Sequence, residues 1–136
     1  MSPVPVLYSM LLCDTAIREQ GTGKYSLIGV FTHIWANRFP AVHAALTIYF
    51  CLTDARGSYD LKLRIRNLKT GEELLPEFPP ITLQVQDRLS VVEQAIQIRN
   101  LKFDEPAKYE VALEANGAPV GSRAFWVGES IKQAEA

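Results

Sequence analysis

The fold is decided by residues 103–127, FDEPAKYEVALEANGAPVGSRAFWV, whose pattern predicts a β-hairpin. Pro106 has no N–H to donate to a strand ladder, and after it apolar residues alternate with more polar ones, as on a strand with one buried face. The apolar set is Tyr109, Val111 and Leu113. Asn116-Gly117 then offers the two positive-φ residues of a tight type I′ turn, so residues 120–127 return antiparallel and end on Phe125 and Val127.

Short alternating or apolar runs recur along the rest of the chain, and no helical period does. With the hairpin they predict about eight or nine strands, at residues 4–12, 24–31, 42–52, 59–66, 72–75, 81–86, 91–99, 109–115 and 120–127. We take Thr32 to Pro40 as a crossing segment between strands, Pro76 to Pro80 as a stiff connector, and residues 128–136 as a polar tail, frayed or a short helix. The predicted fold is all-β, a single antiparallel β-sandwich over residues 1–136.

The cleanest alternation lies in residues 59–66, where apolar and charged side chains take turns. Such a strand has one buried face and one face in water. We expect its apolar residues to share one core with those of the hairpin: Tyr59, Leu61, Leu63, Ile65, Tyr109, Val111 and Leu113.

Composition describes an ordinary globular chain and excludes several classes of function. Of the 136 residues 48% are hydrophobic and 21% charged, and 14 Lys and Arg stand against 15 Asp and Glu, for a net charge of −1. No basic cluster follows a phosphate backbone, so we expect no nucleic-acid partner. The apolar run near the N-terminus is too short to cross a bilayer and lacks the flanks of a signal peptide, so we expect no membrane partner and a cytoplasmic location.

The two cysteines, Cys13 and Cys51, have the spacing of no metal motif. They could in principle form a bridge, but a reducing compartment favours two free thiols, largely buried.

Three short pieces of the chain resemble a family of small uncharacterised bacterial proteins. They are Leu12-Cys13-Asp14, then Gly23-Lys24 followed by residues 27–31, LIGVF, and Phe39-Pro40. The C-terminal hairpin is also similar to many immunoglobulin-like bacterial modules. The resemblance implies a β-sandwich, immunoglobulin-like in the loose sense, with no assigned activity and no functional residues to carry over.

Candidate reactive residues are few and scattered. His33 and His43 stand on separate segments without an HxH or HxxxH pair, so a structural or surface role is favoured over a metal site. A Ser, Cys or Thr nucleophile would need a base within reach, and no sequence neighbour of either cysteine supplies one. Single aspartates in separate turns, namely Asp54, Asp87 and Asp104, fit turn chemistry better than calcium binding. We therefore expect no catalytic residue, no metal and no cofactor.

The hypothesis for function is a non-enzymatic interaction or assembly module. A first alternative is a small-ligand or carbohydrate-binding module, with Trp35, Tyr49 and Trp126 as an aromatic platform. Core or interface packing is the simpler use of these rings, and Trp126 has the opposite parity to Phe125 and Val127. A second alternative, an enzyme, lacks paired catalytic groups.

An asymmetry between strands indicates a partner. The outer faces of residues 59–66 and 109–115 are charged, whereas residues 4–12 and 27–31 are apolar on both faces and the outer face of residues 42–52 is uncharged. If these three segments share a sheet, its outer surface needs a cover. A second copy about a two-fold axis is one cover, which predicts a homodimer; another protein is a second. A covering segment of the same chain, either Thr32 to Pro40 or the tail, is the alternative.

Overall fold

A computed structural model describes residues 2–74 and 81–130, and in these two ranges the chain forms nine strands and no helix. The strands are β1 (Val6–Arg18), β2 (Tyr25–Phe31), β3 (His33–Ala36), β4 (Ala41–Thr53), β5 (Gly57–Asn67), β6 (Ile81–Val85), β7 (Val92–Phe103), β8 (Ala107–Ala115) and β9 (Ala118–Glu129). The described residues contain no helix with the length and apolarity to cross a membrane. The predicted all-β class is confirmed.

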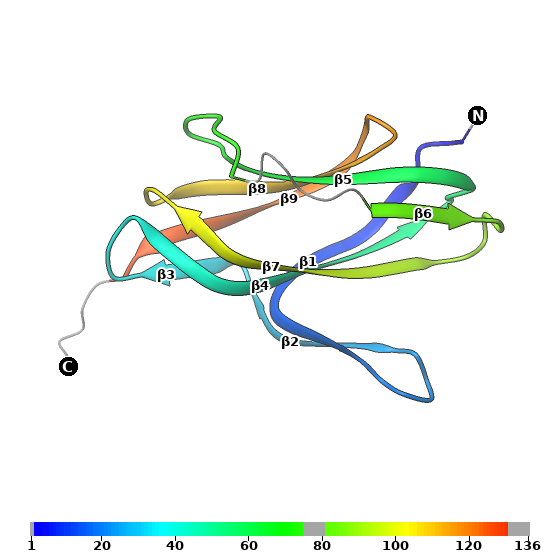
Figure 1. Cartoon of the computed structure of the whole chain (residues 1–136), viewed down its shortest axis with the longest axis horizontal. Coiled ribbons are helices and arrows are strands. Elements are labelled where there is room, and N and C mark those ends of the chain that lie inside the picture. The colour runs from blue at the N-terminus through cyan, green and yellow to red at the C-terminus, as the bar shows by residue number, and fades with distance from the viewer. Residues whose placement is uncertain (1, 75–80, 131–136) are drawn as a thin grey trace.

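The strands form two sheets that lie one above the other as a sandwich (Figure 1). One sheet has four strands in the order β2-β1-β4-β7, and the other has five in the order β3-β9-β8-β5-β6. Neighbouring strands are antiparallel except β3 and β9, which are parallel. The three segments that the sequence singled out for their uncharged outer faces, in β1, β2 and β4, do share a sheet.

One core fills the space between the sheets. The residues predicted to share it are all at most 1% exposed: Tyr59, Leu61, Leu63, Ile65, Tyr109, Val111 and Leu113. The four-stranded sheet contributes its own buried row, of which Leu46, Ile48, Phe50 and Leu52 come from β4 and Met10 and Leu12 from β1. Strand alternation thus delivers apolar side chains from both sheets to one interior.

The C-terminal hairpin has the predicted form. β8 and β9 pair antiparallel, and the turn residues Asn116 and Gly117 have φ of 52° and 83°. Both values lie in the left-handed region that a type I′ turn requires. Phe125 and Val127 are buried and Trp126 between them is exposed, as the parity predicts.

Several predicted boundaries are wrong. β1 continues past Leu12 to Arg18, and β9 runs to Glu129, so the polar tail does not begin at Gly128. The crossing segment Thr32 to Pro40 contains a strand of its own, β3, and a cis peptide bond between Phe39 and Pro40. The predicted edge strand at residues 72–75 is reduced to a single bridge between Glu73 and Arg66. Its last residue, the connector 76–80 and residues 131–136 lie outside the described residues.

Near one end of the four-stranded sheet the side chains change faces. On β7, Ile98 and Leu101 are both buried although they differ in parity, and Asn100 between them has φ of 55°. On the paired strand β4, Leu46 is buried while Val42 is 61% exposed. The positive φ of Asn100 interrupts the pleat, so simple alternation fails beyond it.

Candidate functional sites

The β1–β2 hairpin bends away from the sandwich and lies below the outer face of the four-stranded sheet (Figure 1). Near its tip the hairpin contacts β4 through side chains. The ring centroids of Tyr25 on β2 and Tyr49 on β4 are 5.5 Å apart. Other outer-face residues are buried, with Cys13, Thr47 and Cys51 at most 4% exposed. The hairpin therefore covers part of the face for which the sequence predicted a cover, a role that we had assigned to other segments.

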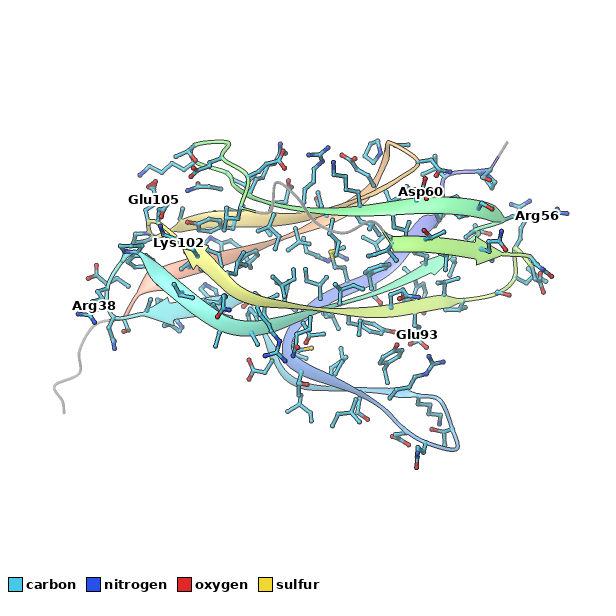
Figure 2. The ribbon with its side chains drawn as sticks, in the orientation of Figure 1. Arg38, Arg56, Asp60, Glu93, Lys102 and Glu105 are labelled. Carbon is cyan, nitrogen blue, oxygen red and sulfur yellow. The ribbon has the colours of Figure 1, made fainter. Side chains whose placement is uncertain are left out.

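The side chain of Tyr49, which packs against this hairpin, is held in place by Glu93 of β7. Its hydroxyl donates a short hydrogen bond to the Glu93 carboxylate, which Figure 2 shows on the side of β7 nearest the hairpin. Burial raises the pKa of Tyr49 well above its usual range, and the hydrogen bond to Glu93 raises it further. The guanidinium of Arg18 lies 5.3 Å from the Tyr25 ring, which extends the contact to the hairpin tip.

Both cysteines are free and buried, as predicted. The Cys13 thiol donates to the carbonyl oxygen of Thr15 at 3.3 Å and lies 3.8 Å from that of Thr47. Burial raises the pKa of Cys13, and the charge of Asp14 adds to the effect. Burial also raises the pKa of Cys51, with a contribution from Glu93. Because a nucleophilic cysteine needs a lowered pKa, this environment favours two packed thiols over two reactive ones.

The other side of the hairpin and the start of β1 expose apolar side chains. We call this set the β1–β2 apolar surface; it consists of Val6, Tyr8, Leu11, Ile17, Ile28 and Val30, which are 42% to 72% exposed. β2 is also the edge strand of its sheet and has no charged residue between Tyr25 and Phe31. An uncharged apolar edge is the kind that other strands can join.

The outer face of the five-stranded sheet is different in kind. Arg64 on β5 pairs with Glu114 of β8 and with Glu73, each at 2.9 Å, and Arg66 pairs with Glu110 at 3.1 Å. These cross-strand pairs lie on the face turned to water, where opposite charges contribute little to stability and keep the surface soluble.

Two of the three rings proposed as an aromatic platform do come together. Trp35 on β3 and Trp126 on β9 both stack on His33, with centroid distances of 5.5 and 5.2 Å and interplanar angles of 11° and 14°. The Lys108 ammonium lies 5.1 Å from the Trp126 ring. We call these four side chains the aromatic ladder. Tyr49 is not part of it, because β4 belongs to the other sheet.

The parallel register of β3 and β9 builds the ladder. His33 is the Cα partner of Trp126, and Trp35 is the partner of Gly128. The Trp35 ring lies over Gly128, where a Cβ would come within 2.6 Å of it. Sequence reasoning missed His33 as the central ring, because a four-residue strand in an irregular segment gives no periodic signal. The HxW spacing, which puts two rings on one face of a strand, was the available clue.

A shallow pocket of about 400 Å³ opens at the corner where the chain passes from β2 to β3. We call it the corner pocket. It is lined by Asp14 from β1, Gly29, Val30 and Phe31 from β2, His33, Ile34 and Trp35 from β3, and His43 from β4. The two histidines, which we had treated as separate, therefore share one pocket. Even so, within the described residues no group of three or more His, Cys, Asp or Glu is arranged to hold a metal ion.

Two features of this pocket are unusual. The Nε2 atom of His43 is buried and has no hydrogen-bond partner among the described residues, which costs about 1–3 kcal/mol for a buried polar atom. The Asp14 carboxylate packs against Gly29, whose φ is 71°. A Cβ at Gly29 would come within 2.3 Å of Asp14 Oδ2, so glycine is required there by both the backbone and the contact.

The aspartates considered for calcium behave as turn residues. The Asp87 carboxylate accepts the backbone N–H of Leu89 at 2.9 Å, and Asp54 has φ of 57° in the turn between β4 and β5. Both are ordinary uses of Asp in turns.

Comparison with known sequences places the chain in a family. The sequence model of the family of unknown function DUF6941 matches residues 8–128, and the chain belongs to this family. No curated protein sequence matches it.

Among solved structures, two similar ones are distant in sequence. One is the alkylpurine DNA glycosylase AlkC of Pseudomonas fluorescens bound to DNA with an abasic site analogue, with 13% identity and a TM-score of 0.49. The match covers 92% of this chain and 30% of that one. The other is a Niemann-Pick type C2 protein from Japanese carpenter ant, with 9% identity, a TM-score of 0.46 and 96% coverage of both chains. Similarity this distant carries no functional assignment.

Proposed function

We propose that this member of the family of unknown function DUF6941 is a non-enzymatic interaction module that associates with a second copy of itself through β2 and the β1–β2 apolar surface. The observation that carries the proposal is the edge of β2, where Ile28 and Val30 are 49% and 53% exposed on a strand without a charge. Apolar side chains and unpaired backbone groups on one edge favour the addition of a strand.

The other sheet edges in the described residues are protected in ways that β2 is not. β7 carries Glu93, Arg99 and Lys102 along its length, while β3 and β6 have only four and five residues. Short or charged edges discourage pairing, so the contrast selects β2 as the edge that remains available.

A second copy fits this edge by symmetry. A two-fold axis at Ile28 would place Ile28 opposite its own copy and Ser26 opposite Val30, in an antiparallel pair without like charges in contact. Two-fold dimers are the commonest soluble assemblies, and a chain with a net charge of −1 repels its copy only weakly. The Ile17 side chain, which is 50% exposed, adds apolar area beside the same edge.

The test compares two lysine substitutions at exposed apolar positions. Ile28→Lys puts a charge at the centre of the proposed contact. Leu89→Lys instead changes a residue that is 87% exposed in the loop between β6 and β7. Light scattering after size exclusion should show a dimer for the native chain and Leu89→Lys, and a 15.2 kDa monomer for Ile28→Lys. A native monomer at about 50 µM, or a dimer that survives Ile28→Lys, would refute the proposed interface.

We further infer a cytoplasmic location, supported by the two free cysteines. Both thiols should react with a thiol reagent after denaturation in non-reducing buffer. Finding them oxidised in protein from the native host would contradict a reducing compartment.

A second candidate function, glycan binding, is favoured by the aromatic ladder, since Trp35 is 63% exposed and Trp126 41%. The faces of these rings are partly occupied by His33 and Lys108, which leaves less flat surface for a sugar than an open platform would. Glycan-array binding that is lost in both Trp35→Ala and Trp126→Ala would support this function. Binding to no glycan would remove it.

A further inference from the structure

The corner pocket collects polar groups that the proposed dimer does not use. Its lining comes from four strands of two sheets, and its titratable side chains are Asp14, His33 and His43. A cavity of about 400 Å³ is within the size range of small-molecule sites.

The pocket's fixed charge is negative. Asp14 takes part in none of the ion pairs formed by the described residues, so no side chain among them neutralises its carboxylate. In residues 2–74 and 81–130 no Lys or Arg lines the pocket. A positively charged ligand group would therefore meet an opposite charge there and no like charge.

The imidazoles offer hydrogen-bond acceptors to the same ligand group. The buried Nε2 of His43 has no partner in the described residues, and a ligand N–H would give it one. His33 Nδ1 lies 3.0 Å from the Thr32 hydroxyl, and the tautomer in which Nδ1–H donates to that oxygen leaves Nε2 as an acceptor. A donor with several N–H groups suits a carboxylate and two ring nitrogens.

The remaining walls are aromatic and aliphatic. Phe31 and the exposed Trp35 present ring surface, which attracts organic cations as well as apolar groups. Val30 and Ile34 add aliphatic surface next to them. These walls suit a ligand whose charged group continues into a short apolar tail.

We propose that the corner pocket binds a small organic primary ammonium compound with an apolar tail. The Asp14 carboxylate forms the ion pair, His43 Nε2 accepts a hydrogen bond from the ammonium, and Trp35 and Phe31 pack on the tail. Gly29 is part of the site because a side chain there would collide with the carboxylate of Asp14, which is exposed at the pocket.

The test uses three probes of the same shape and different charge: phenethylammonium, 2-phenylethanol and 3-phenylpropionate. Each is titrated into ¹⁵N-labelled protein, and amide shifts are followed by NMR. Phenethylammonium should shift the amides of Asp14, Gly29 and His43 and bind about tenfold more tightly than the neutral alcohol, with the carboxylate weakest. Equal affinity of the three probes, or no shift at about 10 mM ammonium, would overturn the proposal.

Matched variants identify the groups responsible. Asp14→Asn keeps the shape and removes the charge, and should weaken phenethylammonium binding about tenfold while leaving the alcohol unchanged. Asp104→Asn, an exposed aspartate paired with Lys102, is the control and should bind like the native chain. His43→Phe should also weaken binding of the ammonium. Native affinity in both Asp14→Asn and His43→Phe would overturn the site even if phenethylammonium binds elsewhere.

Phenethylammonium binding can be tested independently of the dimer and of glycan binding. Ile28 and Trp126 do not line the corner pocket, so Ile28→Lys and Trp126→Ala should keep phenethylammonium affinity. If the dimer fails and the ammonium still binds, only the proposed interface is lost. Loss of ammonium binding in Trp126→Ala would contradict the placement of the site.

Discussion

The two sheets of this sandwich present opposite outer faces. On the five-stranded sheet, β5 and β8 carry arginines and glutamates that pair across strands in water. On the four-stranded sheet the corresponding positions are Cys13, Thr47 and Cys51, which are buried, and the β1–β2 hairpin contacts this face at Tyr49. A charged outer face needs nothing above it, whereas an uncharged one indicates a cover. Here the cover is part of the chain, and it carries new exposed apolar residues on its own far side.

Breaking the core that both sheets share should have the largest effect. Leu63 is fully buried on β5, and Leu63→Ala should lower the free energy of unfolding by about 2–5 kcal/mol through lost burial and a cavity. Urea denaturation measures this. Leu89→Ala, at an exposed loop position, should change it little; a similar small change for Leu63→Ala would show that the core is wrongly placed.

A substitution at Gly29, in the β1–β2 hairpin, should have the next largest effect on stability. Gly29→Ala forces an alanine to φ of 71° and brings its Cβ against Asp14, so it should cost about 2 kcal/mol. Gly21→Ala is the matched control, because φ there is also positive, at 91°, but no atom of the described residues lies within 4 Å of a Cβ. The difference between the two variants isolates the Asp14 contact. Equal losses would mean that the contact adds nothing to the backbone cost.

The sheet face under the β1–β2 hairpin can be weakened at Tyr49. Tyr49→Phe removes the hydrogen bond to Glu93 and should cost about 1 kcal/mol at neutral pH. Because the folded state raises the pKa of Tyr49, the unfolded chain ionises first as pH rises. The stability that Tyr49 adds is therefore fully present below about pH 10 and is lost above it.

The measurement is the stability difference between native protein and Tyr49→Phe as a function of pH. It should be constant between about pH 7 and 9 and shrink above about pH 10. Raised pKa values at Cys13 and Tyr109 affect both proteins and cancel in the difference. The pKa of Cys51 depends in part on Tyr49, so both proteins carry Cys51→Ala. A difference that grows with pH would contradict the assigned contact.

Substitutions on the charged outer face of the five-stranded sheet should change stability least. Arg64→Gln removes two partly exposed ion pairs, and we expect only a small drop in the urea midpoint at low salt. In about 1 M salt, where the screening length is about 3 Å, the drop should vanish. A drop that persists in high salt would mean that Arg64 contributes by packing rather than by charge.

The sequence predicted the parts of this fold that depend on local pattern. The period of two in residues 59–66 and 109–115 located the core, and Asn116-Gly117 located the turn. The sequence did not predict the features that depend on contacts between residues distant in the chain. The four residues of β3 are too few to show a period, so the parallel pairing with β9 and the stack of His33 on two tryptophans were not foreseen.

The hairpin shows the same limit. Leu27 to Phe31 and Val4 to Leu12 lie in one sheet, which the sequence argument posed as a condition, but no local pattern indicates that the hairpin bends back toward Tyr49. The corner pocket is also a product of this bend, because it brings Asp14 beside residues of β3 and β4. These sites depend on which distant residues the fold brings together, so the residue types alone did not predict them.

The central claim, that a second copy covers the edge of β2, is tested most directly by amide hydrogen exchange as a function of protein concentration. Exchange is measured at about 1 µM and at about 100 µM, which span the affinities of ordinary homodimers. Amides of β2 should exchange more slowly at the higher concentration, while those of β6, the edge of the other sheet, should not change. Identical exchange of β2 at both concentrations, in a protein that light scattering shows to be monomeric throughout, would contradict the account.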